Sequence, residues 1–284
     1  RSVFEAFDEY LASVANVDIA RLILSKPFAP VNQPPSVRAA ARRMRAHMAD
    51  WIAAHRADGT SGDIAADIMA ARDPETGEGF DEETLIDQIG VFFLAGHETT
   101  ANALTWAFHI LSEQPDVANA IRTEVNAVAG DGPVTLDVVK QLPYTRAVLK
   151  ETMRLYPPLP FLPRVAMKDT AIGSMAVKRG AMIMIAPWTI HRYRVLWPLA
   201  DRFDPGRFSP DNEKDIPNGA YIPFGLGPRI CVGSGFALVE GTLALARLVR
   251  RFTLTSADAQ SVRPVARLAI RPHAPILTTV TDDG

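Results

Sequence analysis

The most informative segment of the chain reads Phe224-Gly225-Leu226-Gly227-Pro228-Arg229-Ile230-Cys231-Val232-Gly233. It holds the only cysteine among 284 residues, which excludes a disulfide or a multi-cysteine metal site within the chain. Three glycines and a proline favour a tight loop that leaves room for close approach to a flat group. An apolar run with helical spacing follows at residues 234–248. The segment therefore predicts a glycine-rich loop that leads into a helix.

The surroundings of Cys231 favour its ionised form. The residue precedes a predicted helix N-terminus, where free backbone N–H groups and partial positive charge stabilise a thiolate. Arg229, two residues earlier, adds a fixed cation. A stabilised thiolate on such a loop suits an axial ligand of haem iron. The competing interpretation is a buried structural cysteine, which is what most lone cysteines are.

The order of residues in this loop resembles a known signature. A phenylalanine, then glycine, arginine, cysteine and glycine at the spacing of residues 224–233 resembles the haem-ligand loop of cytochrome P-450, a family of haem-thiolate monooxygenases. The resemblance implies haem b (iron protoporphyrin IX) with Cys231 as the iron ligand. It also implies that Arg164 and Arg229 pair with the haem propionates. The further cofactor contacts that it implies are Phe224, Gly225, Gly233, Ala95 and Gly96.

A second segment, Ala95-Gly96-His97-Glu98-Thr99-Thr100, lies inside a long helix predicted over residues 82–112, which Asp81 caps. Glycine and consecutive threonines are poor helix formers, so the segment predicts a kink or an opening of the backbone. The alternative is a solvated glutamate with threonines that bond back to the helix. A zinc-protease motif fails here, because the position of its second histidine is Ala101.

This second segment resembles the oxygen-binding motif of the same family. The resemblance implies that Ala95 and Gly96 border dioxygen. It also implies that Glu98 and Thr99 are the catalytic acid–alcohol pair, which delivers protons while Cys231 donates electron density from the opposite side.

Glu151 and Arg154 share one face of a predicted helix. Most such pairs are exposed, but the apolar neighbours of these two residues favour a buried, hydrogen-bonded ion pair. The pair resembles the family's Glu-x-x-Arg motif, with Arg207 as the second arginine, and the resemblance implies a structural role in holding the coil before the cysteine. Gly206 departs from the family, which commonly has glutamate there. His191 is interpreted as a structural histidine rather than a second iron ligand.

The proline-rich residues 157–164 must be extended. The resemblance implies that Leu159 and Phe161 line a substrate pocket, together with Ala95 and with Leu268 in a later turn. The alternative is a surface linker, although linkers seldom carry so many apolar side chains.

Composition excludes several classes. Lys and Arg number 30 against 32 Asp and Glu, a net charge of −2, which offers no footprint for nucleic acid. No apolar run approaches the roughly 18 residues of a membrane span. A cytoplasmic location is expected. Since Arg1 is not an initiator methionine, we expect upstream sequence to be missing.

The predicted fold is mainly α with a minor β part, a single haem-binding domain over residues 1–284, and the resemblance implies the C-terminal portion of the cytochrome P-450 fold. Besides the long helix, we predict helices at residues 2–24, 38–56, 64–71, 116–129, 144–155 and 234–248. We predict strands at residues 182–185, 252–255, 266–271 and 276–280.

The resemblance, closest to soluble bacterial members, implies a monooxygenase that inserts one oxygen atom of dioxygen into a small apolar organic substrate. Its expected electron donor is a ferredoxin, a flavodoxin or a flavin reductase. Two alternatives stay open: a truncated, non-catalytic haem-binding fragment, and a peroxide-driven relative.

Overall fold

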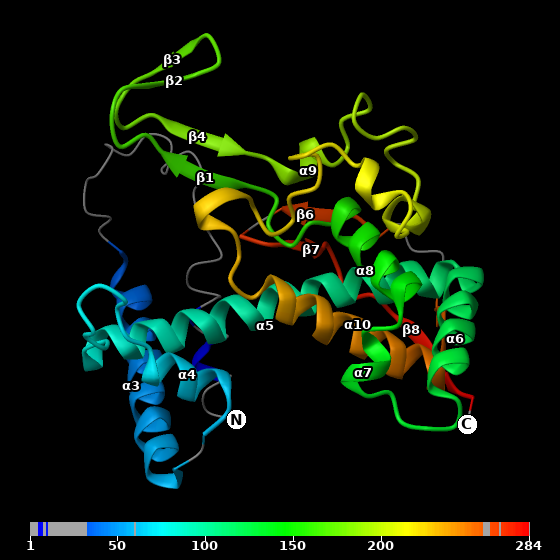
Figure 1. Ribbon diagram of the computed structural model, residues 1–284, viewed down its shortest axis with the longest axis horizontal. Coiled ribbons are helices and arrows are strands. Elements are labelled where there is room, and N and C mark those ends of the chain that lie inside the picture. The colour runs from blue at the N-terminus through cyan, green and yellow to red at the C-terminus, as the bar shows by residue number, and fades with distance from the viewer. Residues whose placement is uncertain are drawn as a thin grey trace. The chain divides into compact units, whose positions relative to one another are not determined.

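The computed structural model describes residues 5–7, 10, 33–59, 61–257, 262–266 and 268–283. They form two compact units, residues 1–97 and 98–284, and the long helix α5 (Glu82–Glu113) contributes to both (Figure 1). The architecture is mainly α with a minor β part, which confirms the predicted class. That the chain is a single domain stays a prediction. Within the described residues, no helix combines the length and the apolar character that crossing a membrane requires.

The first unit contains α3 (Pro35–Asp58), α4 (Ile64–Ala70) and the start of α5. Asp81 caps α5, since its Oδ1 accepts the N–H of Thr84 at 2.7 Å, and this bond lowers the pKa of Asp81. Apolar side chains of α3 and α5 that recur at helical spacing form the core of the unit: Met48, Ile52, Leu85 and Ile89.

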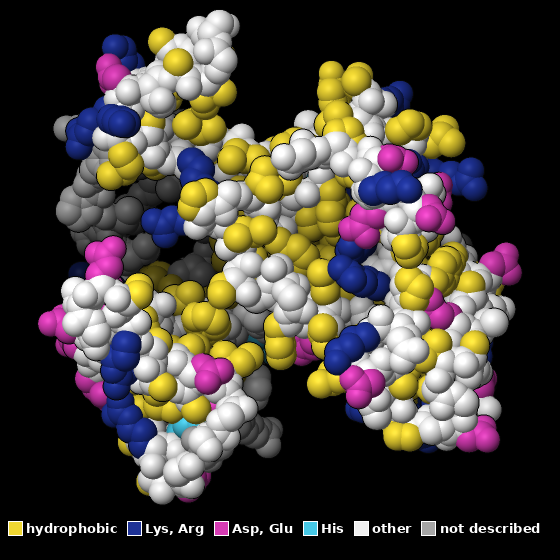
Figure 2. Space-filling view, viewed as in Figure 1, with side chains coloured by type: hydrophobic (Ala, Val, Ile, Leu, Met, Phe, Trp, Pro, Cys, Tyr) yellow, Lys and Arg dark blue, Asp and Glu magenta, His cyan; other side chains and the backbone are white. Residues whose placement is uncertain are grey.

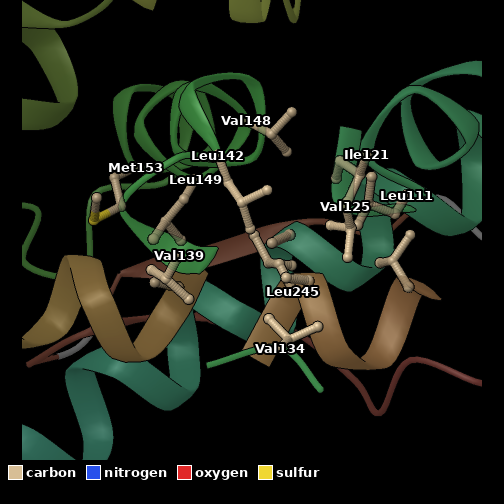
Figure 3. Close-up of a cluster of buried hydrophobic side chains, with 14 residues drawn as sticks. Leu111, Ile121, Val125, Val134, Val139, Leu142, Val148, Leu149, Met153 and Leu245 are labelled. Atoms are coloured by element: carbon tan, nitrogen blue, oxygen red, sulfur yellow. The ribbon is translucent and has the colours of Figure 1, made fainter. Parts of the chain in front are cut away.

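The second unit is built around the rest of α5 and four further helices: α6 (Pro115–Ala129), α7 (Leu136–Val139), α8 (Pro143–Leu155) and α10 (Ser234–Arg251). Their apolar faces meet in one core (Figure 3), whose large members include Leu111, Ile121, Leu142, Leu149 and Leu245. Since α10 begins three residues after Cys231, this core anchors the helix that the cysteine loop leads into.

Helix α8 begins without a capping side chain of its own. Glu124 of α6 supplies the cap instead, because its carboxylate accepts the N–H groups of Tyr144 at 2.7 Å and Thr145 at 2.9 Å. It also accepts the hydroxyl of Thr145 at 2.7 Å. A carboxylate near the positive end of a helix is favourable. The start of α8 is thus fixed to α6.

The described strands pair as two-stranded antiparallel sheets. The pairs are β1 (Leu162–Val165) with β4 (Met182–Ile185), β2 (Thr170–Ile172) with β3 (Met175–Val177), β5 (Phe252–Ser256) with β8 (Thr278–Asp282), and β6 (Pro264–Ala266) with β7 (Ile270–Pro272).

Between β4 and α10 the chain is mostly irregular. The short helix α9 (Pro187–Ile190) and a 3₁₀ turn at Pro205–Phe208 are its regular parts before residue 210. Trp197 and Phe208 are buried with Ala147 of α8, so this segment is packed onto α8. The packing brings this segment close enough to α8 for the polar contacts described below.

The predicted helices at residues 38–56, 64–71, 116–129, 144–155 and 234–248 and the strand at 182–185 are confirmed, with ends that differ by a few residues. The single strand predicted at residues 266–271 is wrong: a turn at Leu268 separates β6 from β7, and the two strands pair with each other. The helix predicted at residues 2–24 lies largely outside the described residues.

The backbone opening predicted at residues 95–100 is not seen, because α5 is α-helical throughout this segment. One glycine and two threonines each disfavour a helix by only about 1 kcal/mol or less. A helix of 32 residues with apolar packing on both sides of the segment overrides that preference.

Candidate functional site

The cysteine loop, residues 224–233, has the tight geometry that its glycines permit. Gly225 and Gly227 have φ angles of 77° and 76°, a region that favours glycine. The N–H of Cys231 donates to the carbonyl of Phe224 at 2.9 Å and closes the loop. A Cβ added at Gly225 would lie 3.7 Å from Cδ1 of Leu162, so the loop packs against the start of β1.

The thiol of Cys231 is free and exposed. Helix α10 begins three residues later at Ser234, and no side chain caps its N-terminus. The backbone N–H groups of the first turn favour an anion beside them. A Cβ added at Gly233 would find only Sγ of Cys231 within 4 Å, at 3.9 Å. The space beside the sulfur is therefore open.

The residues that flank Cys231 in the sequence include large apolar side chains that are not buried. Val232, next to the cysteine, is 80% exposed, although an isolated valine on a globular protein is usually covered. The space-filling view shows hydrophobic side chains around the loop that precedes α10 (Figure 2). Exposed apolar groups that cluster in this way mark a binding surface. The other exposed members are Leu226, Ile230 and Phe236.

Two arginines of the predicted site hold no carboxylate within the described part of the chain. Arg229 lies exposed in the cysteine loop, and Arg164 lies in β1, where its Nη1 donates to the carbonyl of Pro163 at 2.9 Å. Because Gly225 packs against β1, both guanidinium groups come from elements that contact each other. They are available to an anionic ligand.

The acid-bearing segment of α5 shows one clear polar contact. Glu98 is 13% exposed, and its Oε1 accepts bonds from Nη2 of Arg271 at 2.6 Å and from Nε at 3.0 Å. Thr99 beside it is half-buried. Ala95 and Gly96, one turn earlier, are exposed positions of the first unit. Glu98 is therefore an ion-paired carboxylate rather than a freely solvated one.

The predicted substrate-lining residues are apolar and incompletely covered. Leu159 is half-buried, while Phe161 is 37% and Leu268 is 47% exposed. The N–H of Ile270 donates to the carbonyl of Pro158 at 3.0 Å, which holds the Leu268 turn beside the extended segment. The two segments that were predicted to share a pocket are thus neighbours in the structure.

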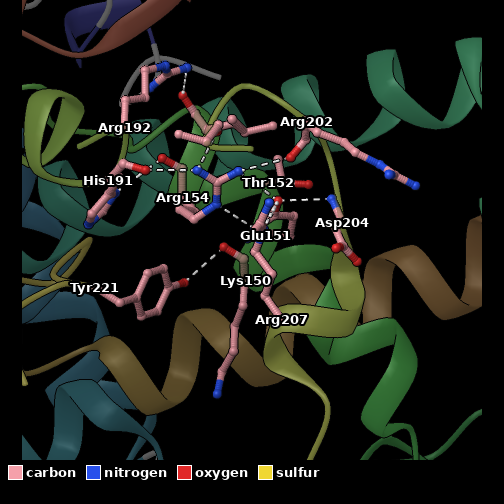
Figure 4. Close-up of polar contacts among 12 residues, drawn as sticks. Lys150, Glu151, Thr152, Arg154, His191, Arg192, Arg202, Asp204, Arg207 and Tyr221 are labelled. Carbon is pink, nitrogen blue, oxygen red and sulfur yellow. Dashed lines mark hydrogen bonds and ion pairs between the residues drawn. The ribbon is translucent and has the colours of Figure 1, made fainter. Parts of the chain in front are cut away.

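Glu151 and Arg154 form an ion pair that is 0% exposed on both sides (Figure 4). Nε and Nη2 of Arg154 donate to the two carboxylate oxygens at 2.7 and 2.8 Å. The remaining donors of Arg154 reach backbone carbonyls: His191 at 2.8 Å, Ala200 at 2.7 Å and Arg202 at 3.1 Å. One guanidinium therefore ties α8 to the irregular segment that leads to the cysteine loop.

Arg207 interacts with the Glu151–Arg154 pair through its charge and not through a hydrogen bond to Glu151. Its Nε lies 3.5 Å from Oε1 of Glu151 without bonding geometry, and its Nη2 donates to the carbonyl of Leu199 at 3.1 Å.

Gly206, where the family commonly has glutamate, has a local reason to be glycine. A Cβ there would lie 3.0 Å from Oδ1 of Asp204, which accepts the N–H of Gly206 at the same distance. Glycine suits that turn.

His191 is fully buried and uses both ring nitrogens inside the protein. Nε2 accepts the N–H of Ile222 at 2.8 Å, and Nδ1 lies 3.2 Å from the carbonyl of Arg154. Since Nε2 accepts, the proton is on Nδ1 and the ring is neutral. Burial lowers the pKa of His191 from 6.5 to about 3. These contacts are those of a structural histidine, because they leave no nitrogen for a metal.

We expect this histidine to make the protein less stable in acid. Its pKa is 6.5 when unfolded and about 3 when folded, so below pH 6.5 the unfolded chain binds a proton that the folded chain rejects. Between about pH 7 and pH 5 this lowers the free energy of unfolding by about 2 kcal/mol. Urea unfolding at pH 7 and pH 5 measures this fall in the free energy of unfolding. We expect a smaller fall in His191→Gln, whose side chain does not titrate. An equal loss in the variant would contradict the assignment.

Comparison with protein families decides what this arrangement is. The family model described as cytochrome P-450 matches residues 1–279. The chain is a cytochrome P-450. The residues around Cys231 fit the haem of this family: an open thiol, an exposed apolar rim and two guanidinium groups without carboxylate partners in the described structure.

Relatives support this assignment. The chain is 35% identical over 213 residues to a cyclooctat-9-en-7-ol 5-monooxygenase of Streptomyces melanosporofaciens, covering 75% of this chain and 46% of the relative. It is 34% identical over 235 residues to a bifunctional cytochrome P-450/NADPH–P-450 reductase of Gibberella moniliformis, covering 82% and 21%. The chain therefore spans about half the length, or less, of these curated relatives.

A solved structure confirms the fold of this cytochrome P-450. The crystal structure of the cytochrome P-450DA haem domain superposes with a TM-score of 0.86 at 26% identity. The superposition covers 100% of this chain and 60% of that one. The predicted cytochrome P-450 fold is thus confirmed.

Sequence reasoning missed several residues of this cytochrome P-450 that contact the predicted site residues or the helix that carries them. Arg271 holds Glu98, and Glu124 caps the helix that carries Glu151. Neither contact has a local signal, because the partners lie 173 and about 20 residues apart. Tyr221, whose hydroxyl donates to the carbonyl of Lys150 at 3.1 Å, was missed for the same reason.

Proposed function

We propose that this protein is a haem-thiolate monooxygenase that inserts one oxygen atom of dioxygen into an apolar organic substrate and releases the other as water. The observation that supports this most is the exposed thiol of Cys231, placed on a glycine-shaped loop before α10 and ringed by uncovered apolar side chains. The name of the Streptomyces relative, a monooxygenase, agrees with it.

Five residues of the cysteine loop, and Arg164 of β1, then have a proposed role in holding haem. Haem, when bound, supplies the iron chemistry that activates dioxygen. Cys231 would ligate the iron as a thiolate, beside Phe224 and the small residues Gly225 and Gly233. Arg164 and Arg229 would neutralise the two propionates, which explains why neither has a carboxylate partner among the described residues.

The reaction needs two electrons and two protons for the oxygen atom that becomes water. We assign proton delivery to Glu98 and Thr99, adjacent residues on α5. The carboxyl group exchanges a proton with solvent water, and the hydroxyl orders the water or oxygen atom that receives it. We assign to Ala95 and Gly96, which carry no bulky side chains, the role of leaving room for dioxygen.

We infer the substrate class from Leu159, Phe161 and Leu268, which we assign to the substrate pocket. Their side chains carry no polar groups, so binding would rest on burial of apolar surface. We assign electron supply to a donor of the ferredoxin, flavodoxin or flavin reductase type. The name of the Gibberella relative, a bifunctional cytochrome P-450/NADPH–P-450 reductase, supports a reductase as the donor.

The absorption spectrum of the reduced carbon monoxide complex tests this proposal. A red-shifted, thiolate-type band together with product formation from dioxygen and a reduced donor is the expected result. A protein that takes up no haem would support the non-catalytic alternative. Turnover with peroxide, but never with dioxygen and a reduced donor, would favour the peroxide-driven relative.

Removal of the Thr99 hydroxyl should separate electron consumption from product. In Thr99→Ala the water or oxygen that the hydroxyl orders is no longer fixed, so we expect roughly a tenfold lower yield of product per electron pair, with peroxide released instead. Thr105→Ala is the matched control, because it removes a hydroxyl from the same helix at a position outside residues 95–100. Unchanged coupling in Thr99→Ala would refute the role given to this hydroxyl.

A further inference from the structure

The carboxylate of Glu98 has a partner from a distant part of the sequence. Arg271 of β7 lies 173 residues away, and two of its nitrogens donate to a single oxygen, Oε1, at 2.6 and 3.0 Å. Within the described residues of the second unit, none donates to the other oxygen, Oε2. The contact is thus one-sided: it fixes one oxygen of the carboxylate and leaves the second available.

The backbone that carries Arg271 is held on both sides. Ile270, one residue earlier, is 1% exposed, and its N–H donates to the carbonyl of Pro158 at 3.0 Å. Its carbonyl accepts the indole N–H of Trp106 at 3.3 Å. Trp106, on α5 two turns after Glu98, is fully buried and stacks on Tyr156 with ring centroids 4.0 Å apart. The start of β7 is therefore fixed relative to the helix that carries Glu98.

A partly exposed ion pair of this kind adds little to stability. Arg271 is 45% exposed, and solvent screens such pairs strongly. The ion pair instead fixes the orientation of the Glu98 carboxylate. A glutamate side chain has several rotatable bonds, and a proton donor must lie within hydrogen-bond distance of its acceptor. An arginine that holds Oε1 selects one orientation of the carboxylate.

We propose, on the basis of the monooxygenase function above, that Arg271 is the positioning residue for the proton-donating acid. Arg271 holds Oε1 of Glu98, and Oε2 carries the proton. An O–H bond forms at Oε2 when hydronium in the solvent transfers a proton and becomes water. It breaks when that proton passes, through the water ordered by Thr99, to the oxygen atom that is released as water. The carboxylate is then restored, and the electrons come from the donor protein.

A double-mutant cycle tests this role. Product formed per electron pair is measured for Arg271→Met, Glu98→Gln and the double variant of the complete protein with haem. We expect Arg271→Met to lower this yield roughly tenfold, part of the contribution of a general acid. We expect no further loss when Arg271→Met is added to Glu98→Gln, because Arg271 acts through Glu98. Arg271→Lys, which retains a cation, should recover most of the yield.

A second measurement needs no turnover. The side-chain Nε–H signal of Arg271 in ¹⁵N-arginine-labelled protein is identified by its loss in Arg271→Met. Its hydrogen bond to Oε1 at 3.0 Å should slow exchange with water. In Glu98→Gln the acceptor loses its charge, so we expect this exchange to be at least several-fold faster.

Arg251→Met is the matched control. Arg251 also pairs with a carboxylate, Asp282, at 2.8 Å and is 62% exposed, but it lies at the end of α10, so its loss should leave the yield unchanged. If the wild type shows the thiolate band and Arg271→Met keeps full yield, the positioning role is wrong and the proposed function stands. The positioning role would also be wrong if Arg271→Met lowered the product yield by the same factor in the wild type and in Glu98→Gln. A wild type without the band would overturn both proposals.

Discussion

We expect Cys231→Ser to abolish the thiolate-type band of the reduced carbon monoxide complex and all oxygenation that depends on an electron donor. Serine has nearly the same shape, so the loop bond from residue 231 to the carbonyl of Phe224, 2.9 Å in the wild type, should survive. Its hydroxyl is a much weaker acid than a thiol and stays protonated beside the helix N-terminus. The variant therefore removes the sulfur that we propose as the iron ligand and little else.

Thr105→Ala is the control for this experiment. Thr105 lies on α5 outside the cysteine loop, and its hydroxyl donates to the carbonyl of Ala101 at 2.8 Å, so its removal leaves the proposed ligand in place. The control should keep the band. A band of unchanged position in purified Cys231→Ser would show that the sulfur is not the ligand, and the proposed function would then fail.

The second large effect is expected on stability. Arg154→Met leaves Glu151 as a fully buried carboxylate without its partner, and it leaves the carbonyls of His191 and Ala200 without a donor. Removing one member of a buried pair typically costs about 3–5 kcal/mol. Unfolding by urea measures the loss directly, unless the variant is already unfolded, which circular dichroism detects.

Two comparisons make this prediction specific. Arg251→Met breaks an exposed pair with Asp282 and should cost about 1 kcal/mol or less. The pH dependence is the other comparison. Burial raises the pKa of Glu151, and without Arg154 nothing equivalent opposes that rise. The folded variant then binds a proton more readily than the unfolded chain, so its deficit relative to the wild type should narrow as the pH falls. A deficit as small as that of Arg251→Met would contradict the structural role.

The sequence predicted the elements that periodicity and capping specify. The cap at Asp81, the apolar stripe of α10 and the shared face of Glu151 and Arg154 are local features, and the structure shows each of them. The apolar neighbours of Glu151 also indicated its burial. The carbonyls that complete the shell of Arg154 could not be predicted, because they lie 37 to 48 residues downstream in an irregular segment.

The candidate site shows the same division. The spacing around Cys231 and the order of residues 95–100 pointed to their chemistry, since both patterns are contiguous. The partner of Glu98 was not predictable, because the pairing depends on how β7 docks on α5 through Ile270 and Trp106. The apolar run at residues 266–271 suggested one strand, since such a run does not reveal where the chain reverses. The turn at Leu268, which only the family resemblance implied, separates two strands.

The cap that Glu124 provides has a consequence for the order of folding. It joins residues only 20 and 21 positions apart, so the entropy lost in closing that loop is modest. The carbonyls that accept hydrogen bonds from Arg154 lie 37 to 48 residues further along the chain, so these contacts close a longer, irregular loop. We therefore expect α6 and α8 to associate early, as a local nucleus, and the coil before the cysteine to dock afterwards on a helix that is already formed.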